Sequence, residues 1–284
     1  MEIKKNYRKD NNLRKSFNNL TKKTFGFDFE DWYKNGFWND NYIPYSIIEN
    51  DKVIANVSVN LIDIIDFGQV KHYIQLGTVM TDEKYRNKGL IRILMNEIDK
   101  DFSEISDGMF LFANDSVVNL YPKFGFSVAE EYRYSKSVAI NSEASVVSVP
   151  MDDKSNWQKV INTFENNIFH GNFDMFNNVD LVMFYLTSFM KDSVYYERKS
   201  GAYVIADVDG DNLFLHSVLS SSPVTIDEIV KAFGKNIKKV TLGFTPSEFN
   251  NWTIEELKED DTTLFVRNFT LEDKKVMFPT LSHA

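Results

Sequence analysis

The sequence predicts an α/β (α+β) protein, with a mixed central sheet flanked by helices and followed by a second, smaller unit. Three observations predict this class. Apolar and polar residues alternate from Val53 to Leu61, which is the period of a half-buried strand. Apolar residues recur every four positions from Leu90 to Phe102, which is the period of an amphipathic helix. The second half then repeats the order strand, hairpin, strand, helix, strand.

The remaining elements of the first half follow from the same signals. A helix is expected from Leu13 to Phe25, and an aromatic-rich segment leads from it to Tyr45. The run 109–113 is apolar throughout, as in a strand that is buried on both faces. Gly125 can end a short helix in the left-handed conformation. The other expected elements are strands near 45–49, 73–81 and 132–138 and a short helix at 116–123.

A change of composition near 141–153 predicts a boundary between two domains, 1–140 and 141–284. In the second domain, alternating carboxylates from Asp207 to Asp211 lack the glycine and glutamate positions of a calcium loop, so a hairpin turn is expected there. Thr225 is placed to cap the helix that follows a serine-rich turn. The expected elements are helices near 157–164, 179–189 and 226–233 and strands near 194–197, 202–207, 213–219 and 237–244.

The composition excludes several classes of function. The chain of 284 residues contains no cysteine, which excludes disulfides, thiolate metal sites and a cysteine nucleophile, and no metal cofactor is expected. No apolar run approaches the roughly 20 residues that span a bilayer, and the start lacks a secretory signal. The net charge of −9 argues against a nucleic-acid partner and leaves room for a cationic ligand such as an amine. We therefore expect a cytoplasmic protein without membrane contact.

The most informative segment joins the strand that ends near Thr81 to the helix that begins after Gly89. Backbone N–H groups at a helix start have no partner within the helix, and together with the helix dipole they bind phosphate oxygens. A glycine there lets a ligand approach the backbone closely. Arg86, Lys88 and Arg92 add positive charge, although a solvated position at the helix start is the alternative for Lys88 and Arg92.

Two motifs together resemble a known family. The loop 86–91 reads Arg-Asn-Lys-Gly-Leu-Ile and resembles the acetyl-CoA pyrophosphate loop of the GNAT N-acetyltransferase superfamily, Gln/Arg-x-x-Gly-x-Gly/Ala. The segment from Tyr121 to Phe126 is similar to the second signature of that superfamily, and the resemblance covers 45–136. Ile91 departs from the pattern. It fits the branch of the mycobacterial enhanced-intracellular-survival acetyltransferase better, and that branch carries a second, degenerate GNAT-like domain, which we expect here without a phosphate loop.

The resemblance implies an N-acetyltransferase, an acyltransferase that transfers an acetyl group from acetyl-CoA to a primary amine by direct attack in a ternary complex. Acetyl-CoA is then the co-substrate, and a small molecule is the preferred acceptor over a protein. Tyr121 matches the general acid that protonates the leaving thiolate. The positions that match the coenzyme site are Val79, Met80 and Thr81 on the strand edge, Arg86, Asn87, Lys88, Gly89, Leu90, Ile91 and Arg92 in the pyrophosphate loop, and Asn114 at the end of the buried strand.

Several alternatives stay open at the level of sequence. Tyr121 could serve only as a packing residue, and Asn114 could cap the helix that follows it. No general base is readable, because His72 stands at the start of its strand, far from the expected thioester. The apolar tail 277–284 could enter the site or dock on the surface. The aromatics from Phe25 to Tyr45 could cover the acceptor or pack as core.

A different class of function also fits these residues. The missing base and Ile91 are compatible with a non-catalytic module that senses acyl-CoA or binds a partner on a degenerate acetyltransferase fold. The acceptor and the preferred acyl chain are not readable, because they depend on the shape of the site and not on the fold. The oligomeric state is not readable either, and a homo-oligomer is one possibility.

Overall fold

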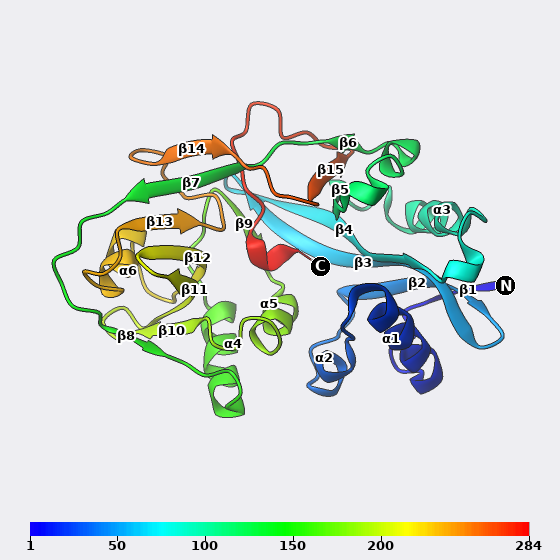
Figure 1. The fold of residues 1–284 in the computed structure, drawn as a ribbon, viewed down its shortest axis with the longest axis horizontal. Helices are drawn as coiled ribbons and strands as arrows, with labels where there is room; N and C mark the ends of the chain where they lie inside the picture. Colours follow the sequence, from blue (N-terminus) through cyan, green and yellow to red (C-terminus); the bar gives the residue numbers. More distant parts are fainter. Residues whose placement is uncertain (284) are drawn as a thin grey trace.

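The computed structural model describes residues 1–283, which fold around two mixed sheets (Figure 1). The predicted fold class is confirmed. The first sheet has the order β1 (Glu2–Lys5), β2 (Tyr42–Glu49), β3 (Lys52–Asp66), β4 (Gln69–Thr81), β5 (Gly108–Ala113), β15 (Thr263–Arg267) and β6 (Ser127–Val128), with β9 (Phe173–Phe176) paired to β3. The second sheet has the order β14 (Thr253–Glu256), β7 (Tyr132–Ser137), β13 (Lys239–Leu242), β12 (Asn212–Leu219), β11 (Ala202–Asp209), β10 (Val194–Glu197) and β8 (Val146–Ser148).

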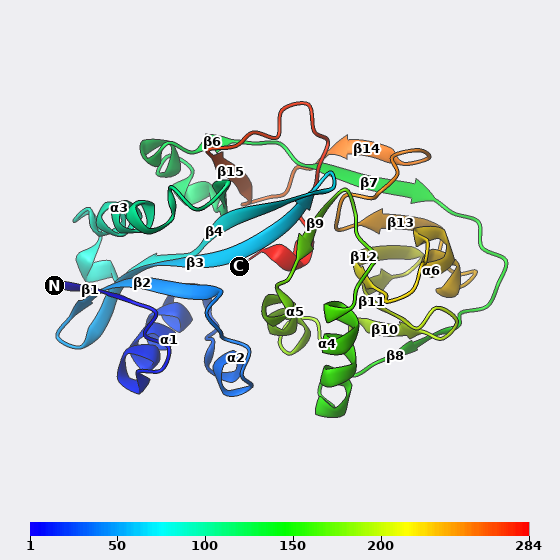
Figure 2. The ribbon, with the colours of Figure 1, turned by 180° about the vertical axis from the view of Figure 1, so that it is seen from behind.

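Helices cover both faces of the first sheet. Helices α1 (Asn11–Phe25) and α2 (Glu30–Lys34) lie on one face, and α3 (Leu90–Phe102) lies on the other, as the two opposite views show (Figures 1 and 2). Two separate clusters of buried side chains fill these two interfaces. Strand β5 contributes Phe110 to the first cluster and Met109 and Leu111 to the second, so it is buried on both faces as expected.

The polar side of β3 is a correction to the sequence analysis. The alternation from Val53 to Leu61 predicts a strand with one solvated face, but Asn56, Ser58 and Asn60 are all buried. Asn56 Nδ2 donates to Ser58 Oγ at 2.9 Å. The prediction was wrong because alternation reports only that the two faces differ in polarity. A polar face can also be buried when its side chains bond one another.

The second half contributes helices α4 (Trp157–Glu165), α5 (Val179–Leu186) and α6 (Ile226–Ala232). The expected hairpin between β11 and β12 is confirmed, with Asp209 opposite Asn212 across the turn. Thr225 caps α6 as expected, through a reciprocal capping box with Glu228. No helix of the described residues combines the length and apolarity that crossing a bilayer requires.

The two sheets exchange strands. The sequence predicts 132–138 as the last strand of the first unit, but β7 pairs with β13 and β14 in the second sheet. In return, β15 comes from the second half and pairs with β5 and β6 in the first sheet. Each sheet has one parallel pair, β4–β5 and β12–β13, each joined through a helix. The strand pairing therefore crosses the proposed boundary at 140/141 in both directions.

The C-terminal segment is buried in the structure. Phe278 is fully buried against Phe110 and Phe173, with ring centroids 4.4 and 4.8 Å away. Thr280 N donates to Gly243 O at 2.9 Å, just beyond the last paired residue of β13. Residues 277–283 therefore pack against the rest of the protein, and docking was one of the two alternatives for this tail. Ala284 lies outside the described residues.

A buried carboxyl group sits where the chain crosses between the sheets. Glu131 lies just before β7 and accepts a 2.8 Å hydrogen bond from Phe278 N. Its burial raises its pKa from 4.5 to about 8, although the bond from Phe278 opposes this shift. The folded protein therefore holds this proton more tightly than the unfolded chain does.

This carboxyl group predicts a pH dependence of stability. Its contribution is fully present below pH 4.5 and is lost as the pH rises to about 8. The free energy of unfolding should fall across this window by at most about 1.4 kcal/mol per pH unit. Glu131→Gln should flatten this slope in urea unfolding at several pH values. Glu130→Gln, at the exposed neighbouring position, should leave the slope intact, and an equal effect of both variants would contradict the assignment.

Candidate functional site

Strands β4 and β5 separate at their carboxyl ends. They pair in parallel only through Tyr73–Gln75 and Gly108–Phe110. Beyond these residues the described pairing stops, while β4 continues to Thr81 and β5 to Ala113. Backbone groups of β4 beyond Gln75 are thus left open toward the gap. Such an opening between parallel strands can receive an extended ligand as an added strand.

A bulge in β4 faces this opening. Thr78 and Val79 together oppose the single residue Val57 of β3, and Thr78 has a φ of +47°. Two side chains hold the bulge. Asn56 Nδ2 donates to Thr78 O at 2.9 Å, and the hydroxyls of Tyr42 and Thr78 share a hydrogen bond of 2.5 Å. The buried polar face of β3 therefore positions the bulge.

A cavity of about 750 Å³ opens where the two strands separate. Its wall gathers most of the residues that the sequence assigned to the coenzyme and to catalysis. Lys88, Gly89, Leu90 and Arg92 are not part of the wall. Leu90 instead packs in the core beneath α3. The assigned residues in the wall are Val79, Met80, Thr81, Arg86, Asn87, Ile91, Asn114 and Tyr121.

The start of α3 forms one side of this cavity. Gly89 precedes the helix with a φ of +73°, and Asn87 has a φ of +61°. No side chain caps the helix, and its first turn carries no acidic residue. The first N–H groups of α3 are therefore open to a ligand, and the helix dipole favours an anion there.

The three basic residues of the loop differ in position. Arg86 belongs to the cavity wall, and its Nε donates to Thr81 O at 3.4 Å. Lys88 Nζ instead lies over the ring of Tyr85, 4.7 Å from its centroid. The guanidinium of Arg92 lies over Phe124, 5.3 Å from the ring centroid. Arg86 is therefore the basic side chain best placed to meet a phosphate in the cavity.

Tyr121 begins a short 3₁₀ turn, Tyr121–Phe124, which Gly125 ends with a φ of +80°. The expected single helix at 116–123 is replaced by this turn and an earlier one, Asp115–Val117. Tyr121 packs against Phe126 and Phe265, and its burial raises its pKa to about 12. The phenol is therefore protonated at neutral pH, and it borders the cavity.

Asn114 does not cap the turn that follows it, which corrects that alternative. Its Nδ2 donates to Asp261 Oδ2 at 2.9 Å, and Asp115 N donates to Asp261 Oδ1 at 2.7 Å. Asp261 comes from the turn before β15, so a residue of the second half holds this part of the wall. The sequence pattern around 261 contains no signal for this long-range contact.

A second, smaller cavity of about 310 Å³ adjoins the first. Phe25 and Thr78 belong to both walls. Of the aromatics of 25–45 that line it, Phe29, Trp32 and Tyr42 are also buried core residues, whereas Phe25 is exposed. His283 contributes to this wall and stacks on Phe112 of the first cavity, with ring centroids 3.8 Å apart. The wall consists of Phe25, Phe27, Phe29, Trp32, Tyr42, Thr78, Leu181, Phe184, Tyr185, Phe189 and His283.

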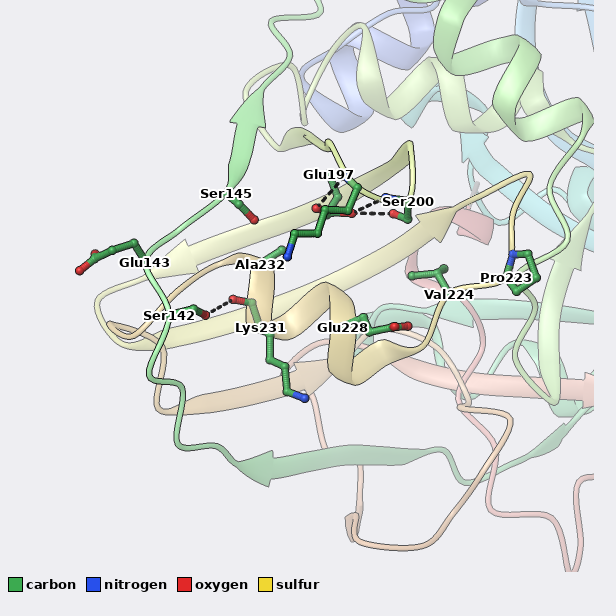
Figure 3. Close-up of a pocket in the computed structure, with 11 residues that line it drawn as sticks. Ser142, Glu143, Ser145, Glu197, Ser200, Pro223, Val224, Glu228, Lys231 and Ala232 are labelled. Atoms are coloured by element: carbon green, nitrogen blue, oxygen red, sulfur yellow. Dashed lines mark hydrogen bonds between the residues drawn. The ribbon is translucent and has the colours of Figure 1, made fainter.

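A third cavity of about 500 Å³ lies in the second unit, between β8, β10 and α6 (Figure 3). The pKa of its Glu197 is lowered. Burial alone would raise this pKa, but hydrogen bonds from Ser200 and Lys199 to the carboxylate outweigh the effect of burial. Ser200 N donates to Glu197 Oε2 at 2.7 Å. This carboxylate is thus satisfied by its own turn. The capping box of Thr225 likewise occupies the start of α6, in contrast with the open start of α3.

Two contributors to the site, Thr78 and Phe112, had no assigned role in the sequence, and His283 belongs to the tail 277–284, for which entry into the site was one of two alternatives. Thr78 forms the bulge, Phe112 joins the two cavities, and His283 comes from the far end of the chain. Thr78 lies within an expected strand. Its positive φ could not be predicted, because β-branched residues rarely adopt such a conformation. His283 could not be placed, because no local pattern links residue 283 to strand β5.

Comparisons with known proteins concern the family of residues 12–126 and the fold of the whole chain. Residues 12–126 match the model of the acetyltransferase (GNAT) family. No curated protein sequence matches the chain. Three solved structures resemble it over nearly its whole length, at identities that show the fold alone.

The first is a conserved protein of unknown function from Enterococcus faecalis, described as a probable N-acyltransferase, with a TM-score of 0.65 and 13% identity over 94% of this chain and 71% of that one. The second is a GCN5-related N-acetyltransferase from Kribbella flavida, with a TM-score of 0.55 and 12% identity over 94% and 72%. The third is Eis1 from Mycobacterium abscessus, with a TM-score of 0.57 and 10% identity over 93% and 73%. The resemblance that the two motifs indicated is confirmed.

Proposed function

We propose that this chain, which carries a GNAT-family domain at residues 12–126, transfers an acetyl group from acetyl-CoA to a primary amine. One observation carries the proposal. A single cavity brings together the open edge of β4, the uncapped start of α3 and the ring of Tyr121. These are a site for an extended arm, a site for phosphate and a proton donor. No other described cavity combines them.

In this proposal, the donor lies along the gap between β4 and β5. The pantetheine arm pairs with backbone groups of Val79, Met80 and Thr81, as an added strand would. The pyrophosphate is bound by the N–H groups of 87–92 and by the side chain of Arg86, whose own N–H donates to Glu83 O. Asn114, held by Asp261, borders the coenzyme. The thioester then lies near the bulge at Thr78.

The reaction needs one nucleophile and one proton donor. The amine nitrogen attacks the thioester carbonyl, and a backbone N–H stabilises the developing oxyanion. The C–N bond forms, the C–S bond breaks, and the coenzyme leaves as a thiolate. Tyr121 donates its proton to this thiolate, because burial keeps the phenol protonated at neutral pH. The nitrogen releases one proton to solvent as the amide forms, and Tyr121 takes up one proton from solvent, so the protons balance.

Thermal unfolding tests whether the donor binds. Acetyl-CoA at about 100 times its dissociation constant should stabilise the protein by about 2.7 kcal/mol, which raises the melting temperature by about 5–10 °C. ADP should give a smaller shift, since it lacks the pantetheine arm. No shift with saturating acetyl-CoA would contradict the proposal.

A charge change in the loop tests where the phosphates lie. Asn87→Asp keeps the shape and tolerates the positive φ, but it adds a negative charge to the cavity wall. We expect acetyl-CoA to bind about 5- to 10-fold more weakly, which corresponds to about 1 kcal/mol of repulsion. Asn251→Asp is the matched control, because Asn251 also has a positive φ and is exposed elsewhere. Equal affinities of the two variants for acetyl-CoA would show that the phosphates do not bind at this loop.

A further inference from the structure

The second sheet repeats the layout of the donor site. Its parallel pair, β12 and β13, is joined through α6, as β4 and β5 are joined through α3. The pairing of β12 with β13 ends at Leu215 and Leu242, although β12 continues to Leu219. Strand β12 also carries a bulge at this point, since His216 has no partner in β11. A gap like the one between β4 and β5 is therefore expected between β12 and β13.

In the second sheet, the C-terminal segment fills this gap. Thr280 N donates to Gly243 O at 2.9 Å, just beyond the end of the pairing. A side chain at Gly243 would not fit, because an added Cβ atom would lie 2.8 Å from Thr280 Oγ1 and 3.0 Å from Thr280 Cγ2. Ser282 N donates to Pro279 O at 2.8 Å and closes the 3₁₀ turn that begins at Thr280. The chain's own backbone thus lies where, in the first sheet, the pantetheine arm is proposed to lie.

A row of hydrogen bonds ties Thr280 to the second sheet. The Thr280 hydroxyl and His216 Nδ1 lie 3.0 Å apart, and His216 Nε2 lies 3.0 Å from Asp207 Oδ2. Ser193 Oγ donates to Asp207 Oδ1 at 2.6 Å. The ring of His216 also packs on Phe214, with ring centroids 4.7 Å apart. Because a hydroxyl can both donate and accept, the bond to Thr280 forms whether the imidazole is neutral or protonated.

The imidazole of His216 is almost fully enclosed. Its side chain is 10% exposed, whereas the side chain of Asp207 is 58% exposed. The row of hydrogen bonds therefore runs from the surface inward to the C-terminal segment. Without the Thr280 hydroxyl, His216 Nδ1 would lose its partner inside the protein, and an unpaired buried polar atom costs free energy. His216 therefore favours one position of Thr280.

The segment that Thr280 anchors continues to the donor site. The next two residues, Leu281 and Ser282, are 2% and 0% exposed, so packing holds the chain on both sides. His283 then stacks on Phe112, which borders the donor cavity. The aromatic cavity that His283 lines also reaches the bulge of β4. An anchor in the second unit therefore sets the position of the wall next to this bulge.

We propose that His216 is a positioning residue for acetyl transfer, and that it acts through Thr280 by fixing the C-terminal segment beside the thioester. The gap between β12 and β13 then binds this segment in place of a coenzyme. The start of α6 agrees with this use, because the capping box of Thr225 and Glu228 occupies groups that would otherwise face a phosphate. The inference rests on the proposed function and gives the second unit a role in it.

Thr280→Val tests this role, because valine keeps the branched shape of threonine and lacks the hydroxyl. With the best acceptor among propylamine, benzylamine and 1,4-diaminobutane, kcat should fall by about 10-fold, because the wall beside the thioester is no longer fixed. The KM for acetyl-CoA should change by less than about 2-fold, since the loop 86–92 and the strand edge 79–81 still hold the donor.

Two further variants separate positioning from stability. Thr280→Ser keeps the hydroxyl and should recover most of the wild-type kcat. Thr241→Val changes a half-buried threonine of β13 and should leave kcat unchanged. If Thr280→Val lowers only the melting temperature and the folded variant keeps the wild-type kcat, the role of Thr280 is purely structural and the inference is overturned.

His216→Leu tests whether the two side chains act as one unit. The variant should show the same fall in kcat as Thr280→Val, and the double variant should fall no further, because either change alone breaks the same bond. Independent, multiplying losses in the double variant would overturn the inference.

Hydrogen exchange tests the anchor without turnover. Amide exchange in the peptide 278–283 should be about 10-fold faster in His216→Leu and in Thr280→Val than in the wild type, while a peptide from β11 keeps its wild-type rate. Unchanged exchange in either variant would overturn the inference. If exchange responds as expected but the wild-type protein acetylates no amine, the proposed function fails and the anchoring of the segment by His216 stands.

Discussion

Tyr121→Phe should lower kcat about 100- to 10,000-fold, with little change in acetyl-CoA binding. The substitution removes only the hydroxyl that would protonate the leaving thiolate. The ring keeps its packing against Phe126 and Phe265. Release of the coenzyme thiol measures the rate, and the thermal shift with acetyl-CoA measures binding. We expect the rate of coenzyme release to fall sharply and the thermal shift with acetyl-CoA to remain.

The control for this variant is Tyr203→Phe. Tyr203 is also buried, but it lies in β11 and lines neither cavity of the site. Its loss should leave kcat unchanged. If Tyr121→Phe retains full turnover, Tyr121 is a packing residue and another group protonates the thiolate. If the wild-type protein binds acetyl-CoA but acetylates no amine, the acyl-CoA-sensing module becomes the better account.

Residues 1–140 alone should not fold cooperatively. In the whole chain, β15 covers the edge of β5 from Met109 to Ala113, and Phe265 is nearly fully buried. Without the second half, β5 exposes its backbone edge, and β7 has no partner. The core below α1 and α2 also loses Phe173 and Phe278. Circular dichroism during heating should therefore show no sharp transition.

Two fragments test the exchange of strands directly. Co-expression of 1–140 with 141–284 should restore a cooperative transition, because it returns β15 to the first sheet and β7 to the second. The reassembled pair should then show the acetyl-CoA shift of the whole chain. A sharp transition in 1–140 alone would mean that the exchange contributes little to stability.

Sequence patterns indicated the residues of the proposed donor site because its parts are local. The strand, the glycine and the helix of 73–102 are continuous in the chain, and their periods are those of the observed elements. Tyr121 and Gly125 were placed by a short motif whose turn forms within a few residues. Lys88 and Arg92 were assigned with the loop, but their side chains lie over Tyr85 and Phe124. Charge in a loop does not fix where a long side chain rests.

The aromatic cavity was not readable in the same way. Its wall combines Phe29 and Trp32 of the first half with Phe184 of α5 and with His283. These residues are up to about 250 positions apart, and aromatic residues at each position are equally typical of a core. Only the packing of α5 and the C-terminal segment against the first sheet turns them into one cavity.

The sequence by itself determined the order of the elements, the open helix start at Gly89 and the position of Tyr121. It did so because hydrogen-bond period, glycine conformation and turn chemistry act over a few residues. The tertiary structure decided which strands pair, and so placed β7 in the second sheet and β15 in the first. It also decided that Asn56 is buried and holds the bulge. Strand edges and polar faces accept many partners, and long-range packing selects among them.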